Sequence, residues 1–195
     1  MSFARILAAG VSAAAVICTA GAASASEAWI GVYAHDLGPA ARERGTQDIQ
    51  IGYRTERVEA WTYLFKPQVH VLASFNTSKN THFAAVGLSW PIRLTDALYI
   101  RPGMGIAYTT GEAGLPPANA PGLTQAEIDR RVALNRSRID FGSKVLFEPE
   151  LALGYHFSDS WSAELSWTHL SNGQILHQGK NQGLDDVGAR LIKRF

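Results

Sequence analysis

The stretch WSAELSWTHLSN, residues 161–172, has the alternation of a β-strand. Successive side chains of an extended strand point to opposite faces of the sheet, so one face here is apolar and the other polar. The apolar face consists of Trp161, Ala163, Leu165 and Trp167. The same alternation places His169 and Ser171 at the end of that face, roughly 7 Å apart at Cα. A base beside a hydroxyl is the minimum for an activated serine nucleophile.

The rest of the chain repeats this pattern in short segments separated by turn residues. We expect strands at residues 28–35, 48–54, 67–75, 82–92, 98–108, 141–157, 161–171 and 184–195. Residues 55–66 either continue the second strand or form a turn. The sequence therefore predicts about eight strands and no central helix.

Alternation with charges on the second face allows two architectures. A soluble barrel or sandwich would bury the apolar face, whereas a membrane barrel would turn it towards lipid. Aromatic residues near strand ends and charges of both signs on the other face favour the membrane. The chain also ends in Phe195, as outer-membrane barrels usually do. We predict an all-β fold, an eight-stranded antiparallel transmembrane β-barrel of the outer membrane.

The first 25 residues have the features of a secretory signal peptide. Arg5 is followed by an apolar run, and residues 23–25 read Ala-Ser-Ala, a cleavage site. Cys18 raises the alternative of a lipoprotein signal, but the residues before it are not small. We expect a signal peptide at 1–25 and a barrel domain at 26–195. No later segment is apolar and long enough for a membrane-spanning helix.

Cleavage at this site would change the composition. It removes Arg5 and the single cysteine, so the mature chain carries 17 of the 18 basic residues against 17 acidic ones. A neutral chain argues against a general nucleic-acid binder. Without cysteine there are no disulfides, so stability must come from the fold.

Loop lengths predict the orientation of the barrel. Outer-membrane barrels keep short turns in the periplasm and long loops outside. Residues 93–96 and 158–160 form short connections, and residues 111–140 form a long one. His169 and Ser171 would then face lipid at the depth of the outer leaflet.

The long loop contains a capping-box signature at Thr124 and Glu127, which predicts a helix to about Asn135. Arginines gather here, and two interpretations stay open. They could bind lipopolysaccharide phosphates, or they could lie on a solvated helix with Glu127 and Asp129 as partners. The arginines are Arg130, Arg131, Arg136 and Arg138.

An acid for the pair comes from the last strand. In the alternation of the last strand, Asp185 falls on the same face as the apolar residues that follow it. An antiparallel register that places Asp185 opposite His169 keeps both residues on one face of the sheet. Asp186 would point into the lumen. Taken singly, His169 reads as an interfacial polar residue, Ser171 as part of a turn and Asp185 as a loop end. Their agreement in face and depth favours a site.

The other histidines (His35, His70, His82 and His156) show no metal-ligand spacing, and His177 lies in a loop.

The motif His169-Leu-Ser171-Asn172-Gly173, followed by Asn181-Gln-Gly183-Leu-Asp185 and a strand ending in phenylalanine, resembles the PagL family of lipid A 3-O-deacylases. Residues 147–155 are also similar to that family, and the specific match covers about the last 50 residues.

The resemblance implies a Ser-His-Glu triad on the lipid-facing wall of the barrel. Ser171 would be the nucleophile and His169 the base, and Asp185 would take the place of the family's glutamate. The resemblance also suggests Asn172 as an oxyanion contributor. Parity points the Asn172 side chain away from Ser171, so a backbone amide of Asn172 or Gly173 could serve instead.

The implied function is hydrolysis of the ester-linked acyl chain at the 3-position of lipid A, in the outer leaflet. This chemistry requires no metal and no cofactor, and the expected partners are lipopolysaccharide and outer-membrane lipid. A non-enzymatic barrel, either an adhesin or a lipopolysaccharide-binding structural protein, is the alternative. Acyl transfer to a sugar hydroxyl would use the same serine. The sequence leaves open a homodimer and the identity of the acyl chain.

Overall fold

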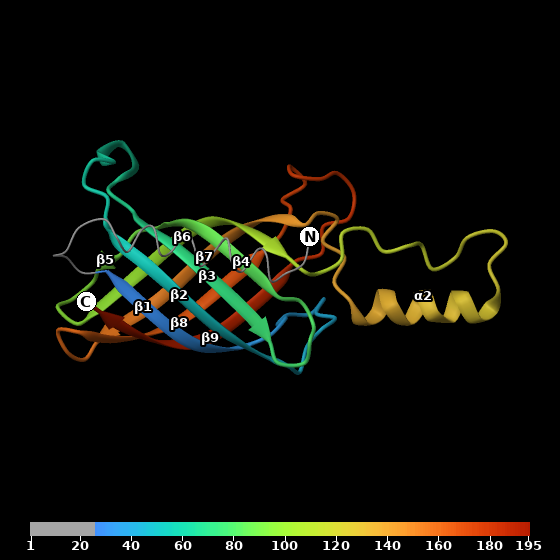
Figure 1. The fold of residues 1–195 in the computed structure, drawn as a ribbon, viewed down its shortest axis with the longest axis horizontal. Coiled ribbons are helices and arrows are strands. Elements are labelled where there is room, and N and C mark those ends of the chain that lie inside the picture. Colours follow the sequence, from blue (N-terminus) through green and yellow to red (C-terminus); the bar gives the residue numbers. More distant parts are fainter. Residues whose placement is uncertain (1–25) are drawn as a thin grey trace.

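The computed structural model describes residues 26–195, so the expected signal peptide lies outside the described residues. The described chain is an antiparallel β-barrel with its connections at the two ends (Figure 1). Its strands are β1 Glu27–Ala34, β2 Gln47–Arg57, β3 Gln68–Asn76, β4 Phe83–Ser89, β5 Ile92–Arg93, β6 Leu98–Thr109, β7 Val145–His156, β8 Trp161–Leu170 and β9 Leu184–Arg194.

Two pairings close the barrel, one between the first and last strands of the chain and one that joins the two ends of the sheet. β1 pairs with β9, and β4 pairs with β6, so eight strands form a continuous ring. The two-residue β5 pairs with one end of β6 and is not part of the ring. Closure leaves no open edge, as a sheet in lipid requires. The predicted eight-stranded antiparallel barrel is confirmed.

The expected strand at residues 141–157 begins later than predicted. β7 starts at Val145, and Phe141 is fully buried instead of facing outward. Gly142 has φ +70°, which turns the chain, and the Phe141 N–H donates to Glu112 O at 2.9 Å. Residues 139–141 therefore belong to a compact cap over the outer end of the barrel.

The outer wall is apolar and the lumen is polar. Large apolar side chains on the outside are exposed, among them Ile30, Val32, Leu153 and Leu165. Their neighbours in sequence point inward and are buried, and many carry charges. This arrangement is that of a membrane barrel with a filled interior.

Three arginines and three glutamates fill the part of the lumen nearer the end where the chain terminates, and we call them the inner cluster. Its members are Arg54, Arg101, Arg190, Glu27, Glu150 and Glu164. Arg190 Nη1 and Nη2 each donate to the Glu150 carboxylate at 2.8 Å. Arg190 Nε donates to Glu164 at 2.5 Å, and Arg101 Nη1 to Glu27 at 2.6 Å. The charges within this cluster balance.

The two ends of the barrel differ. One end, where the chain ends at Phe195, has short connections at residues 94–97 and 157–160 and a longer loop between β2 and β3 that contains the 3-10 helix η1, Thr62–Leu64 (Figure 1). The other end carries the longer loops and the helix α2, Gln125–Ser137, which projects away from the barrel. Thr124 caps α2 by accepting from Glu127 N at 3.3 Å, as predicted. Within residues 26–195, no helix has the length and apolar character needed to cross a membrane.

The inner cluster generates a prediction about stability. Glu150→Ala removes the bidentate partner of Arg190 and leaves a buried guanidinium without its full complement of negative charge. We expect the free energy of unfolding to fall by about 3–5 kcal/mol. Urea unfolding in lipid vesicles measures this loss. Asp96→Ala, which breaks the exposed pair with Arg93, should change little. Equal effects of the two substitutions would contradict the prediction.

Candidate active site

Strands β8 and β9 bring His169 and Asp185 together on the outer wall. The two residues are direct cross-strand partners, which is the register that parity allowed. His169 Nδ1 lies 2.8 Å from Asp185 Oδ1. The side chains are 28% and 37% exposed, so the pair is reachable from outside the barrel. Because Nδ1 faces the acid, Nε2 is the ring nitrogen left for proton transfer.

Trp167 makes a second contact with the same carboxylate. Its Nε1 donates to Asp185 Oδ1 at 2.9 Å, and its ring stacks on that of His169 with centroids 6.0 Å apart. The Asp185 carbonyl accepts from Leu37 N at 2.7 Å, which fixes its backbone to the loop after β1. Asp185 is thus held by three groups and has little freedom to turn away from His169.

Ser171 continues the outward face just beyond the end of β8. Its backbone forms an antiparallel bridge with Phe147, with N···O distances of 2.7 and 3.2 Å. Among the described residues, no hydrogen bond joins Ser171 Oγ to His169. Ser171 is half-buried and lies two residues after His169, on the same outward face.

Gly183 leaves the space that the His169 ring occupies. A Cβ atom at this position would lie 2.6 Å from His169 Cε1 and 3.2 Å from Nε2. Extending the β8–β9 register by one pair puts Gly183 opposite Ser171. A side chain here would therefore clash with the His169 ring on the side that carries Nε2.

The Asn172 side chain points inward and is fully buried. Its Nδ2 donates to Phe141 O at 2.6 Å and to Lys180 O at 2.7 Å, and its Oδ1 accepts from Gln174 N at 2.7 Å. Its backbone N–H donates to Asn181 Oδ1 at 2.8 Å. Asn172 thus fastens the loop after β8, and its donors are occupied.

Gly173 follows in a left-handed conformation, with φ +62°. Within residues 26–195, its N–H has no hydrogen-bond partner. Of the two residues predicted to stabilise an oxyanion, Gly173 is the one with a free backbone donor beside Ser171.

Three of the four loop arginines have partners within the described part of the chain. Arg130 and Arg131 both bind Glu127, and these hydrogen bonds, with Arg130 first, lower the pKa of Glu127 to about 2. Arg138 turns inward, with Nε 3.5 Å from Glu43 Oε1 and Nη1 donating to Asn80. The arrangement of Arg130 and Arg131 is that of a solvated helix.

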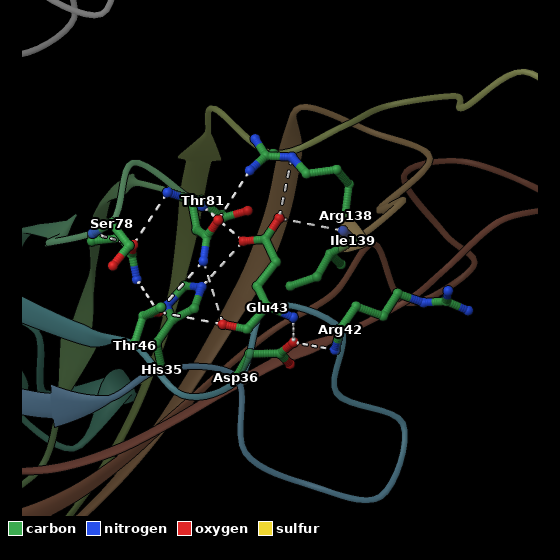
Figure 2. A network of polar contacts seen from close by, with 12 residues as sticks. His35, Asp36, Arg42, Glu43, Thr46, Ser78, Thr81, Arg138 and Ile139 are labelled. Carbon is green, nitrogen blue, oxygen red and sulfur yellow. Dashed lines mark hydrogen bonds and ion pairs between the residues drawn. The ribbon is translucent and has the colours of Figure 1, made fainter. Parts of the chain in front are cut away.

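Asp186 points into the lumen, opposite to Asp185, and joins a group that the sequence did not reveal. We call it the outer cluster, and it consists of His35, Asp36, Glu43, Asp48, Arg138 and Asp186. Figure 2 shows His35 beside Glu43, with Arg138 approaching the same carboxylate. Spacing along the chain gave no signal, because these residues come from four separate segments.

Comparison with known proteins identifies the family of this chain. The family model "Lipid A 3-O-deacylase (PagL)" matches residues 32–194. No curated protein sequence matches the chain.

Solved structures resemble the fold. A crystal structure of the outer membrane enzyme PagL is 13% identical, with a TM-score of 0.53, and covers 87% of this chain and 98% of its own. A designed transmembrane β-barrel is 11% identical, with a TM-score of 0.51, covering 90% and 98%. The Yersinia pestis outer membrane protein Ail is 11% identical, with a TM-score of 0.47, covering 89% and 100%.

The family match spans most of the chain, and the barrel has an apolar wall suited to the outer membrane. The resemblance read from residues 169–185 is confirmed. The chain belongs to the PagL family of outer-membrane lipid A 3-O-deacylases.

Proposed function

We propose that this lipid A 3-O-deacylase removes its acyl chain with Ser171 as nucleophile, His169 as general base and Asp185 as the acid that orients the base. The observation that carries the proposal is the 2.8 Å contact between His169 Nδ1 and Asp185 Oδ1, on the outward face and two residues from Ser171. A serine, a base and an orienting acid in one line form the minimal triad.

The reaction proceeds in two steps. His169 Nε2 takes the Ser171 proton while Oγ attacks the ester carbonyl, and the sugar 3-oxygen leaves with the proton that His169 returns. Water, deprotonated by His169, then attacks the acyl-enzyme and releases the fatty acid and free Ser171. Apo structures often show loose nucleophile–base contacts that tighten with substrate, so a rotation of Oγ towards Nε2 completes the array.

The shorter acid is compatible with this role. Aspartate has one methylene less than the family's glutamate, yet the direct cross-strand register with His169 brings its oxygen to 2.8 Å from Nδ1. The Trp167 N–H shares Asp185 Oδ1 and holds its rotamer. A positioned carboxylate stabilises the imidazolium that forms as Ser171 is deprotonated.

The oxyanion is assigned to the Gly173 N–H. Its left-handed backbone turns the amide at the end of β8, and the Asn172 amide is engaged with Asn181. A backbone donor needs no reorganisation during the reaction, which is the source of its catalytic value.

The location of the site matches the substrate. Lipid A lies in the outer leaflet, and His169, Ser171 and Asp185 face outward at the end of the barrel that carries the long loops. The acyl chain can therefore approach the wall laterally, without leaving the membrane. The ester hydrolysis itself requires no metal and no redox cofactor.

The first test replaces the nucleophile. Mass spectrometry of lipid A from outer membranes carrying the wild type should show the loss of one 3-hydroxyacyl group, and Ser171→Ala should abolish this loss. Ser166→Ala is the matched control, because Ser166 lies on β8 but points into the lumen. Deacylation that persists in folded Ser171→Ala would overturn the assignment. An acyl chain found on a sugar hydroxyl instead of as free acid would indicate transfer.

The acid is tested by Asp185→Asn. The amide can present its N–H to Nδ1 and stabilise the wrong tautomer of His169, so kcat should fall about 10³–10⁴-fold. Heat-dependent electrophoretic mobility confirms that the barrel is folded. A loss below about tenfold would remove Asp185 from the triad.

Gly183→Ala tests whether the space beside His169 matters. The added Cβ would displace the ring, and a misplacement of about 1 Å can cost about 10²-fold in rate. Gly103→Ala is the control, because the atoms nearest to its added Cβ lie 3.4 Å away or more. Deacylation rates of the two folded variants should differ strongly, and equal rates would contradict this view of Gly183.

A further inference from the structure

Three residues of the outer cluster bring potential metal-ligand atoms together inside the barrel. His35 follows β1, Asp48 lies on β2 and Asp186 on β9. His35 Nδ1 is 3.0 Å from Asp48 Oδ1 and 3.5 Å from Asp186 Oδ1. Ligands at about 2.1 Å from a tetrahedral Zn²⁺ ion lie about 3.4 Å from one another. The observed separations are close to that value.

The second observation is an unsatisfied carboxylate oxygen. Asp186 is fully buried, and its Oδ2 has no hydrogen-bond partner within residues 26–195. A buried charged oxygen without a partner is costly, so such atoms usually mark a ligand or a proton. Its carboxylate is directed at His35 and Asp48, the two other residues of the group.

Charge balance points in the same direction. The outer cluster holds four buried carboxylates (Asp36, Glu43, Asp48 and Asp186) but offers His35 and Arg138 as its cations. In the inner cluster, three arginines match three glutamates. Buried charges are retained when they are paired or bind a metal. The outer cluster therefore has an excess of negative charge that a divalent cation would offset.

Glu43 supplies the outer support that a metal-bound histidine normally has. Its Oε2 is 3.2 Å from His35 Nε2, and it also accepts from Thr81 N at 2.8 Å (Figure 2). A carboxylate on the distal nitrogen fixes the tautomer and leaves Nδ1 for the metal. Glu43 is thus placed to orient His35.

We propose that His35 Nδ1 and the carboxylates of Asp48 and Asp186 bind one divalent transition-metal ion of the Zn²⁺ type in the outer lumen. One imidazole and two carboxylates suit a borderline ion such as Zn²⁺, whereas Ca²⁺ prefers six to eight oxygens.

A metal ion at this site would stabilise the backbone next to Asp185, the proposed catalytic acid. Asp36 N donates to Asp186 Oδ1 at 3.2 Å, and Leu37 N donates to Asp185 O at 2.7 Å. An ion shared by His35, Asp48 and Asp186 would join the loop after β1 to β2 and β9. It would stabilise the segment that carries Asp185 without touching the substrate.

The test is metal binding by the folded protein in detergent micelles free of lipopolysaccharide, because lipid phosphates also bind cations. After dialysis against a chelator, calorimetric titration with Zn²⁺ should show one site per chain, and bound Co²⁺ should give the visible absorption of a tetrahedral complex. Asp186→Asn and His35→Gln should abolish both signals. Glu148→Gln, a neutralised buried carboxylate in the lumen beside His70, should retain them.

Each outcome decides the proposal. Absence of Zn²⁺ and Co²⁺ binding by the wild type would overturn it, and would indicate that protonated His35 serves as the cation. Binding that survives Asp186→Asn, or tighter binding of Ca²⁺ than of Zn²⁺, would also overturn it. These measurements do not depend on Ser171, so they can fail while the deacylase mechanism stands.

Discussion

The strict alternation of side chains along strands closed into a ring is the constraint on which the structure depends. Closure satisfies the backbone of every strand within the sheet, so each residue must face either lipid or lumen. Asp185 and Asp186 show the consequence. They are adjacent and chemically identical, yet one faces outward to His169 and the other inward to His35. A one-residue slip of β9 would exchange them and destroy both arrangements.

The buried charges of the inner cluster and of the outer cluster are stabilised in different ways. In the inner cluster, arginine and glutamate side chains satisfy one another through bidentate contacts such as Arg190 with Glu150. The outer cluster instead relies on backbone amides, since Asp36 accepts from the N–H groups of Arg42 and Glu43. Backbone donors stabilise carboxylates without adding positive charge, so the side chains of the outer cluster leave an excess of negative charge.

The sequence predicted the features that follow from alternation. The barrel, the faces of His169, Ser171 and Asp185, and the helix cap at Thr124 all depend on period and local propensity. It did not predict features made by loops folding back on the barrel. Phe141 continues the parity of β7, yet Gly142 turns it inward, and no periodicity argument detects such a turn. The hydrogen bond from Asn172 to Phe141 O and the contacts of the outer cluster with Arg138 and Asp186 likewise join residues that are far apart in the sequence.

The role proposed for Asp185 depends on local packing that brings a short carboxylate side chain to His169. In a direct cross-strand pair the Cβ atoms are about 4.5–5.5 Å apart, so a short carboxylate can reach an imidazole without bending the sheet. A short side chain reaches His169 only if its backbone and rotamer are held in place. Leu37 N holds the Asp185 backbone by donating to its carbonyl oxygen, and Trp167 Nε1 holds the carboxylate. Gly183 completes the arrangement by leaving room for the ring that Asp185 orients. Asp185, Trp167 and Gly183 therefore together fix the position of the His169 ring.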